Sequence, residues 1–274
     1  MNCLLEISDL QIEFRGGNRT VEAVRGCHLQ LAAGEILGLA GESGSGKSIT
    51  ALACLGLVPK PGQVTGSIVL DGHEMVGATE AAAGKIRGGV AAMIFQNPGK
   101  ALNPFFTIGQ QLVRTIAHVR HLDTNTAQRA AISALIDVSV PDPELVLRKY
   151  PHQVSGGQLQ RIMIAMALGC KPKLLIADEP TTALDVTIQA QIIVLLRQLA
   201  RDHGLTILFI THDLGVVSNL CDRLAVMYAG QVVESGPVED LLNDPAHPYT
   251  ASLLTAVPVL GGGRRLLTQI PGAV

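Results

Sequence analysis

Several features that would place this chain in another class of protein are missing from its sequence. No apolar run approaches the roughly 18–20 residues that a membrane-spanning helix needs. The first residues, from Met1 to Glu6, lack the charged region and the long apolar stretch of a secretory signal. We therefore expect any association with a membrane to come through a partner protein.

The chain also has little net charge and no closely paired cysteines. It carries 21 Lys and Arg residues against 23 Asp and Glu residues, a formal net charge of −2. The chain therefore has no excess of positive charge that would attract nucleic acid. An odd, dispersed set of cysteines without a CxxC pair is typical of reduced, mostly buried thiols in a cytosolic protein. We expect structural roles for all five, which are Cys3, Cys27, Cys54, Cys170 and Cys221.

The length and the hydrophobic content of the chain suit one large domain, or a domain with an inserted subdomain. It has 274 residues, of which 47% are hydrophobic. Apolar and polar residues alternate between Leu4 and Leu31, which is typical of antiparallel strands. Short apolar runs follow, with helical periodicity between them, and predict buried strands at Ile36–Ala40, Val90–Phe95, Leu174–Ala177, Thr206–Phe209 and Leu224–Met227. This alternation predicts an α/β fold with a parallel sheet covered on both faces.

One segment interrupts the alternation. From about Asn97 to Val154 the sequence has helix-like stretches near Ile108–Val119 and Ala127–Val138, several prolines and no clear strand. We interpret it as an inserted helical subdomain, at about residues 97–165, within a domain that spans residues 1–260. The glycine run that begins at residue 261 predicts a flexible tail over residues 261–274.

A glycine-rich loop follows the first buried strand. It has the pattern G-x-x-x-x-G-K-S and lies directly between a strand and a helix pattern. Glycines let consecutive backbone N–H groups turn toward phosphate oxygens at a helix N-terminus. Lys47 would reach the β- and γ-phosphates of ATP, and the Ser48 hydroxyl would bind Mg²⁺. The predicted phosphate-binding residues are Gly41, Ser43, Gly44, Ser45, Gly46, Lys47 and Ser48.

Two carboxylates end another buried strand. Asp178 and Glu179 follow four apolar residues, at the edge where open α/β sheets bind their ligands. We predict that Asp178 holds Mg²⁺ through its waters. Glu179 is placed to accept a proton from the water that attacks ATP. The pair is a weak signal alone and becomes specific in a chain that also has the glycine-rich loop.

A third motif precedes a helix pattern that runs from Leu159 to Leu168. Its backbone N–H groups and the helix dipole would form a second anion-binding end, although a loop with a helix N-cap would also explain it. The motif consists of Ser155, Gly156, Gly157 and Gln158.

Together the three motifs resemble the ATP-binding cassette family, over about residues 4–258. The resemblance implies a P-loop NTPase with a RecA-like parallel sheet core, an N-terminal antiparallel β subdomain and an inserted α-helical subdomain. It also implies that the motif at 155–158 closes over the ATP that an opposite subunit holds.

The resemblance gives roles to further residues. Gln96 looks like the glutamine that senses Mg²⁺ and the membrane subunit. Asp185 resembles part of the loop that touches the partner's site across the dimer. His212 is similar to the histidine that contacts the γ-phosphate, although such a residue alone is more often a hydrogen-bonding residue at a strand end. Phe14 sits where the family stacks an aromatic ring on adenine, and a core position explains it equally well.

A narrower likeness indicates the peptide/nickel importer branch of this family. It appears in Asn103-Pro104, around the second and third motifs, and in the segment Pro245–Thr250. Many peptide-importing members carry a cysteine-rich tail after an Ile-Pro-Gly like that at residues 270–272, and this sequence has no such cysteines up to Val274. We therefore favour nickel or a nickel chelate slightly as the cargo, with di- or oligopeptides as the alternative.

The family likeness also implies the partners. An importer ATPase of this branch works with two transmembrane permease subunits, a second ATPase subunit that is commonly a different one, and an extracytoplasmic solute-binding protein. It would lie at the cytoplasmic face of the bacterial inner membrane. A soluble cassette ATPase acting on DNA or ribosomes would usually bring a coiled coil, two cassettes or a basic surface, and a small-molecule P-loop kinase would leave the third motif unexplained.

Overall fold

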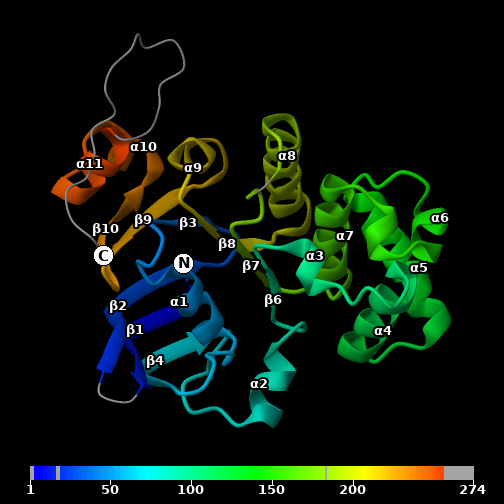
Figure 1. Ribbon diagram of the computed structural model, residues 1–274, viewed down its shortest axis with the longest axis horizontal. Coiled ribbons are helices and arrows are strands. Elements are labelled where there is room, and N and C mark those ends of the chain that lie inside the picture. The colour runs from blue at the N-terminus through cyan, green and yellow to red at the C-terminus, as the bar shows by residue number, and fades with distance from the viewer. Residues whose placement is uncertain (1–2, 17–18, 183, 256–274) are drawn as a thin grey trace. The chain divides into compact units, whose positions relative to one another are not determined.

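The computed structural model describes residues 3–16, 19–182 and 184–255, and the chain divides into two compact units (Figure 1). The first unit joins Met1–Ala83 to Thr206–Val274, and the second is Gly84–Leu205. The tail expected at 261–274 lies outside the described residues. In the part of the chain that the structure describes, no helix is both long enough and apolar enough to cross a membrane.

The first unit contains two sheets and their helices. Its elements, in chain order, are β1 (Cys3–Gly16), β2 (Arg19–Ala32), β3 (Ile36–Ala40), α1 (Lys47–Cys54), β4 (Gly62–Leu70), β5 (His73–Glu74), β8 (Thr206–Thr211), α9 (Leu214–Leu220), β9 (Arg223–Tyr228), β10 (Gln231–Pro237), α10 (Val238–Asn243) and α11 (Pro248–Thr255). Helix α2 (Glu80–Ile86) contains the boundary between the units.

The N-terminal residues form an antiparallel sheet with the strand order β2-β1-β4-β5. This confirms the antiparallel pairing expected from the alternating residues, because apolar residues such as Ile7, Leu10 and Ile12 are buried while their neighbours face outward. The register between β1 and β4 shifts after Ser8, beside Gly66. Only a glycine fits there, since its φ is +91° and a Cβ would lie 2.2 Å from a backbone oxygen.

The second sheet of this unit has the order β10-β9-β3-β8. Strand β3 is buried along its whole length and pairs in parallel with β8 and β9, as its continuous apolar sequence predicts. The strands predicted for this sheet are parallel to one another, and β10, which the sequence analysis does not predict, runs antiparallel to β9. A short turn joins these two strands, and such a turn can only connect antiparallel neighbours.

The second unit combines a parallel strand pair with a run of helices. Its elements are β6 (Ala91–Ile94), α3 (Pro98–Ala101), α4 (Ile108–Arg120), α5 (Thr124–Asp137), α6 (Pro143–Arg148), a 3₁₀ turn (Pro151–Gln153), α7 (Gly156–Gly169), β7 (Leu174–Asp178) and α8 (Val186–His203). The described residues between 97 and 154 contain helices and turns without a strand, as the sequence analysis expects.

Side-chain caps set the N-terminal ends of the longer helices of this unit, α4, α5, α7 and α8. Thr107 begins α4 with a capping box, since its hydroxyl accepts from the Gln110 N–H while the Gln110 side chain accepts from the Thr107 N–H. Asp123 caps α5 through the Thr126 N–H. The sequence of α8 has apolar residues at 3.6-residue spacing, and four of them are buried, which are Ile192, Leu195, Leu196 and Leu199.

Candidate functional site

The glycine-rich loop lies in the first unit, between the buried strand β3 and helix α1. Two of its glycines are required by the backbone around them. Gly41 has a φ of +152°, and a Cβ there would lie 2.1 Å from the Met227 carbonyl oxygen. Gly46, at the N-cap of α1, has a φ of +105°, and a Cβ would lie 2.6 Å from the Ala23 carbonyl oxygen. The loop therefore keeps its path only with glycine at these two positions.

Lys47 is buried, and its ammonium lies inside the curve of the loop. Its Nζ atom donates hydrogen bonds to the Gly41 and Glu42 carbonyl oxygens, at 2.8 and 2.6 Å, and contacts Ser45 Oγ at 3.3 Å. The loop thus holds a positive charge at its centre, where the predicted phosphates would bring negative charge.

The N-terminus of α1 is suited to an anion. Within the described residues no side chain caps it, and its first turn contains no acidic residue. Such a terminus presents backbone N–H groups and the positive end of the helix dipole. Ser48 lies in this first turn and is exposed. The loop, the lysine and the helix terminus together form a cradle that fits the phosphates of ATP. The Ser48 hydroxyl is an oxygen ligand of the kind that Mg²⁺ binds.

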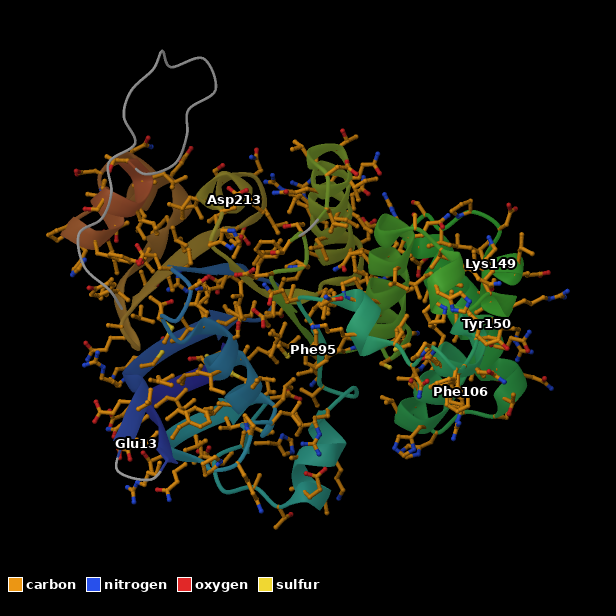
Figure 2. All side chains as sticks on the ribbon, in the orientation of Figure 1. Glu13, Phe95, Phe106, Lys149, Tyr150 and Asp213 are labelled. Atoms are coloured by element: carbon orange, nitrogen blue, oxygen red, sulfur yellow. The ribbon has the colours of Figure 1, made fainter. Side chains whose placement is uncertain are left out.

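His212 directly follows strand β8, at the same edge of the sheet as the loop. Ala40 and Thr211 are partners in the parallel register of β3 and β8, so the residues after them leave the sheet side by side. His212 is exposed, and the next residue, Asp213, caps α9 through the Gly215 N–H (Figure 2). The first unit therefore brings His212 and the phosphate-binding loop to one edge.

Phe14 lies on β1, and its ring is half-buried against another strand. A Cβ added at Gly62 of β4 would lie 2.9 Å from the Phe14 ring, so the ring covers this glycine. This contact gives Phe14 a packing function. Its role at adenine stays a prediction.

In the second unit, Gln96 and Glu179 meet at the carboxyl ends of two parallel strands. Ile94 of β6 is the register partner of Ala177 of β7, so the residues two positions further along the chain also lie close together. Gln96 Nε2 donates a hydrogen bond of 2.8 Å to Glu179 Oε2. Figure 2 labels Phe95, which directly precedes Gln96 at this end of β6.

A second donor binds the same carboxylate oxygen of Glu179. The Thr182 hydroxyl donates to Oε2 at 2.9 Å. Glu179 itself has a φ of +45°, a conformation that costs a residue with a side chain about 1–2 kcal/mol. Strain of this kind is often retained where a side chain must be aimed. Asp178, the last residue of β7, is buried beside it.

The third motif forms the N-terminus of α7. Ser155 is its N-cap, and Ser155 and Gln158 make a reciprocal capping box with two hydrogen bonds of 3.3 Å. Gly157 is packed against the Ile188 side chain, since a Cβ there would lie 3.0 Å from Ile188 Cγ2. Gly156 is different, because a Cβ at that position would meet nothing within 4 Å.

Asp185 caps helix α8. Its Oδ1 atom accepts a hydrogen bond of 2.9 Å from the Ile188 N–H. The structure thus gives local structural functions to Asp185 and Ser155, and their contacts with a nucleotide or a partner stay predictions.

The sequence analysis does not identify the contacts of two residues at these sites, Thr182 and Tyr249. Thr182 receives no role there, although its spacing of three from Glu179 places it within reach across a turn. Tyr249, whose hydroxyl contacts the phosphate-binding loop at Glu42, lies in a segment that the family likeness marks, but nothing in the sequence indicates this contact, because more than 200 residues separate the two.

Comparison with known proteins identifies two family profiles in the chain. The profile described as ABC transporter matches residues 24–182. The profile described as oligopeptide/dipeptide transporter, C-terminal region, matches residues 233–274. The first match covers the glycine-rich loop, the third motif and the Asp178-Glu179 pair.

Curated relatives are similar along almost the whole chain. The oligopeptide transport ATP-binding protein OppD of Haemophilus influenzae is 47% identical over 272 residues, which cover 99% of this chain and 84% of that protein. The probable D,D-dipeptide transport ATP-binding protein DdpD of Escherichia coli is 46% identical over 273 residues, covering 99% and 83%.

Solved structures share the fold. The dimeric ATP-binding cassette MJ0796, in a post-hydrolysis state bound to ADP and Pi, superposes with a TM-score of 0.76 at 26% identity, covering 85% of this chain and 98% of that one. The protein cbiO1 of Clostridium perfringens, part of the ABC transporter complex cbiONQ, gives a TM-score of 0.75 at 26% identity, covering 89% and 92%. The expected P-loop NTPase fold is confirmed.

Proposed function

Since this chain belongs to the ABC transporter family, we propose that it is the ATP-hydrolysing subunit of an importer of di- or oligopeptides. The chain is an ATPase of the ATP-binding cassette type, and its hydrolysis of ATP is coupled to transport. The observation that carries the peptide assignment is the match of residues 233–274 to the C-terminal region of oligopeptide and dipeptide transporters. Both curated relatives described above are peptide transport proteins by name.

The peptide assignment replaces the slight preference for nickel. That preference rested on the lack of cysteines after Ile270-Pro271-Gly272. The C-terminal profile matches as far as residue 274 without those cysteines. Their absence therefore does not distinguish a nickel importer from a peptide importer.

The glycine-rich loop supplies the phosphate site in this proposal. Backbone N–H groups of the loop other than that of Glu42, and those of the first turn of α1, bind the phosphates, and Lys47 neutralises their charge. Ser48, Asp178 and Gln96 are the residues that would hold Mg²⁺. When bound, Mg²⁺ neutralises the charge that develops on the transferring phosphoryl group. His212 is assigned to the γ-phosphate.

Glu179 is the proposed general base. Its carboxylate accepts the proton of the attacking water, and Gln96 and Thr182 orient it by donating to one of its oxygens. This hydrogen bonding supports the assignment, because a base must be aimed as well as ionised. The strained backbone at Glu179 is a second sign that this side chain is held in a particular direction.

The motif at residues 155–158 is proposed to bind ATP held by a second ATPase subunit. Gly156 supports this, because neither its φ nor the space around it requires a glycine within this chain. Glycine at an exposed helix start lets a ligand from outside approach the backbone closely. Asp185 is assigned to the same interface.

A substitution at Ser155 tests this arrangement. We expect Ser155→Arg to leave the ATP affinity of the isolated subunit unchanged and to abolish ATP hydrolysis by the assembled transporter. Loss of ATP binding by the isolated subunit would contradict the shared site and place the motif in the subunit's own pocket.

The assembled transporter tests the cargo. We propose two permease subunits, a second and different ATPase subunit and a solute-binding protein as partners, at the cytoplasmic face of the bacterial inner membrane. We expect oligopeptides to stimulate ATP hydrolysis by the complex reconstituted in liposomes with its binding protein. Stimulation by nickel or nickel–histidine alone would overturn the peptide assignment, and Lys47→Ala controls for contaminating ATPases.

A further inference from the structure

The C-terminal helix α11 contacts the phosphate-binding loop through one side chain. The backbone N–H of Glu42 donates a hydrogen bond to the hydroxyl oxygen of Tyr249, with a nitrogen–oxygen distance of 3.1 Å. Glu42 is the second residue of the loop, and Tyr249 lies 207 residues later in the chain. Tyr249 belongs to the region matched by the peptide-transporter profile and to none of the three nucleotide motifs.

The peptide group that joins Gly41 to Glu42 is held at both of its polar atoms. Its carbonyl oxygen accepts a hydrogen bond of 2.8 Å from Lys47 Nζ, and its N–H donates to Tyr249. In a trans peptide these two atoms point in opposite directions. The two bonds therefore fix the rotation of this peptide group about the chain axis, and with it the direction of the N–H groups that follow in the loop.

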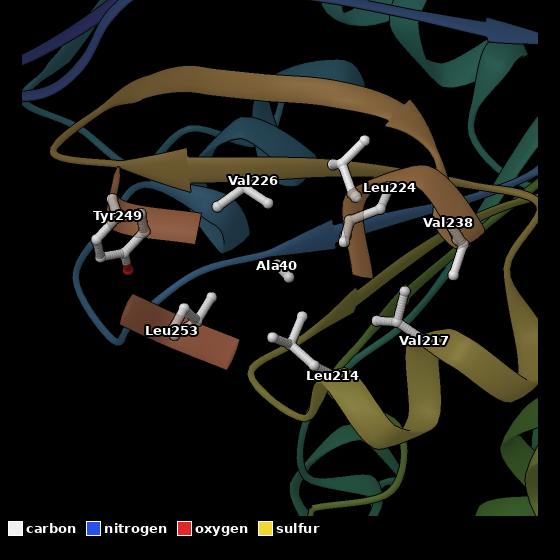
Figure 3. Close-up of a cluster of buried hydrophobic side chains, with 9 residues drawn as sticks. Ala40, Leu214, Val217, Leu224, Val226, Val238, Tyr249 and Leu253 are labelled. Carbon is white, nitrogen blue, oxygen red and sulfur yellow. The ribbon is translucent and has the colours of Figure 1, made fainter. Parts of the chain in front are cut away.

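The Tyr249 ring is held in place by packing. It lies 4.4 Å from the Tyr228 ring, centroid to centroid, at an angle of 40°. One turn further along α11, Leu253 packs into the same buried cluster, which also contains Ala40, the residue directly before the loop (Figure 3). Burial raises the pKa of the Tyr249 hydroxyl above its ordinary value, so the group stays protonated in any ordinary assay.

The segment before α11 is fixed to the sheet by a carboxylate. Glu234 of β10 accepts hydrogen bonds from the backbone N–H groups of Ala246 and His247, at 2.8 and 3.2 Å. The His247 ring then accepts from the Tyr249 N–H at 3.1 Å. The position of the Tyr249 hydroxyl is thus determined from the strand edge, from the helix and from the stacked ring.

We propose that Tyr249 is a positioning residue for the phosphate-binding loop, and that it makes the C-terminal region a working part of the nucleotide site. It holds the Gly41–Glu42 peptide so that the N–H groups of the loop meet the phosphates of ATP. The proposal rests on the ATP-binding role given above to residues 41–48. It implies that any partner that displaces α11 lowers the affinity for ATP.

The test removes one oxygen atom from the full-length chain. Tyr249→Phe keeps the ring, its stacking and its burial, and deletes the acceptor for the Glu42 N–H. The free energy of one hydrogen bond corresponds to a change of about 2–12-fold in an equilibrium constant. We therefore expect the Kd and KM for MgATP to rise about 2–12-fold, with kcat within about twofold of wild type. The melting temperature without nucleotide should fall by no more than a few degrees, because the same hydrogen bond is present without nucleotide, and the increase produced by MgATP should become smaller.

Tyr228→Phe is the matched control. It makes the same chemical change on the stacked partner ring, whose hydroxyl has no hydrogen-bond partner among the residues described. We expect this variant to bind and hydrolyse ATP like wild type. Equal ATP affinity in Tyr249→Phe and Tyr228→Phe would overturn the proposal, and so would a loss of kcat at unchanged Kd.

Lys47→Ala separates this proposal from the one on which it rests. If Lys47→Ala loses ATP binding while Tyr249→Phe binds normally, the phosphate site stands and the role of Tyr249 is refuted. If Lys47→Ala binds ATP like wild type, the phosphate site itself is misplaced and both proposals are refuted.

Discussion

Replacing Glu179 by glutamine tests the catalytic assignment with little change in shape. Both described hydrogen bonds of the carboxylate, from Gln96 and Thr182, go to Oε2. The amide oxygen of a glutamine accepts the same two bonds, and its NH₂ group replaces Oε1. The variant therefore keeps the position of the side chain and loses the ability to take a proton.

The expected loss follows from general-base catalysis. We expect ATP turnover by Glu179→Gln in the assembled transporter to fall about 10²–10⁴-fold, which corresponds to about 2.7–5.4 kcal/mol of activation free energy. Equilibrium binding of MgATP should stay within about twofold of wild type, and the ATP-bound dimer should accumulate. Single-turnover hydrolysis and nucleotide titration measure the two quantities separately.

Two comparison variants make the result interpretable. Glu144→Gln makes the same change at an exposed site on α6 and should leave turnover unchanged. Thr182→Val removes the hydroxyl that donates to Glu179 and should reduce turnover about 2–12-fold, the effect of losing one hydrogen bond. The loss should be no larger, because solvent partly screens the charge of this half-buried carboxylate. Turnover by Glu179→Gln within about threefold of wild type would refute the reasoning and move the base to another residue.

Three further outcomes follow from the first unit. Gly41→Ala should destabilise the fold by more than about 3 kcal/mol in urea unfolding, because its Cβ would overlap the Met227 carbonyl oxygen; a loss below 1 kcal/mol would contradict the observed loop path. Burial alone would raise the pKa of Glu234, but the hydrogen bonds that the carboxylate accepts lower this pKa below its ordinary 4.5. The ionised carboxylate therefore stabilises the fold above pH 4.5, and this stabilisation is lost as the pH falls through the lowered pKa. The difference in melting temperature between wild type and Glu234→Gln should therefore shrink on acidification below pH 4.5. A constant difference would argue against hydrogen bonding of the ionised Glu234 carboxylate to the Ala246 and His247 N–H groups. Iodoacetamide should modify the exposed Cys3 first, since burial raises the pKa of Cys54 to about 12.

The sequence predicts the elements that carry the nucleotide chemistry well, because each has a strong local signal. The buried strand before the glycine-rich loop, the strand that ends in Asp178, and helix α8 lie where the apolar periodicity places them. Gly41 and Gly46 are necessary for backbone reasons that the motif already implies. The meeting of Gln96 and Glu179 follows from parallel strands that end at one edge.

The strands β4 and β10 are not predicted, and the reason is physical. Both have few buried positions and contain glycines, and β10 ends in a proline, so neither shows the alternation of a half-buried strand. They are strands because β1 and β9 offer them edges, which is a tertiary effect. The contact of Tyr249 with Glu42 depends in the same way on packing between segments distant in sequence. The family likeness marks the segment Pro245–Thr250 without saying what it touches.

The order of the strands in the first unit has a consequence for synthesis on the ribosome. Strand β3 is apolar throughout, and both of its neighbours, β8 and β9, come after the whole of the second unit in the chain. At the usual elongation rate of about 5–20 residues per second, β3 waits roughly 10–40 s for its partners. During that time an unpaired hydrophobic strand is exposed next to the nascent phosphate loop. The nucleotide site is thus completed late in synthesis. Until then, chaperones or the N-terminal sheet must keep β3 from aggregating.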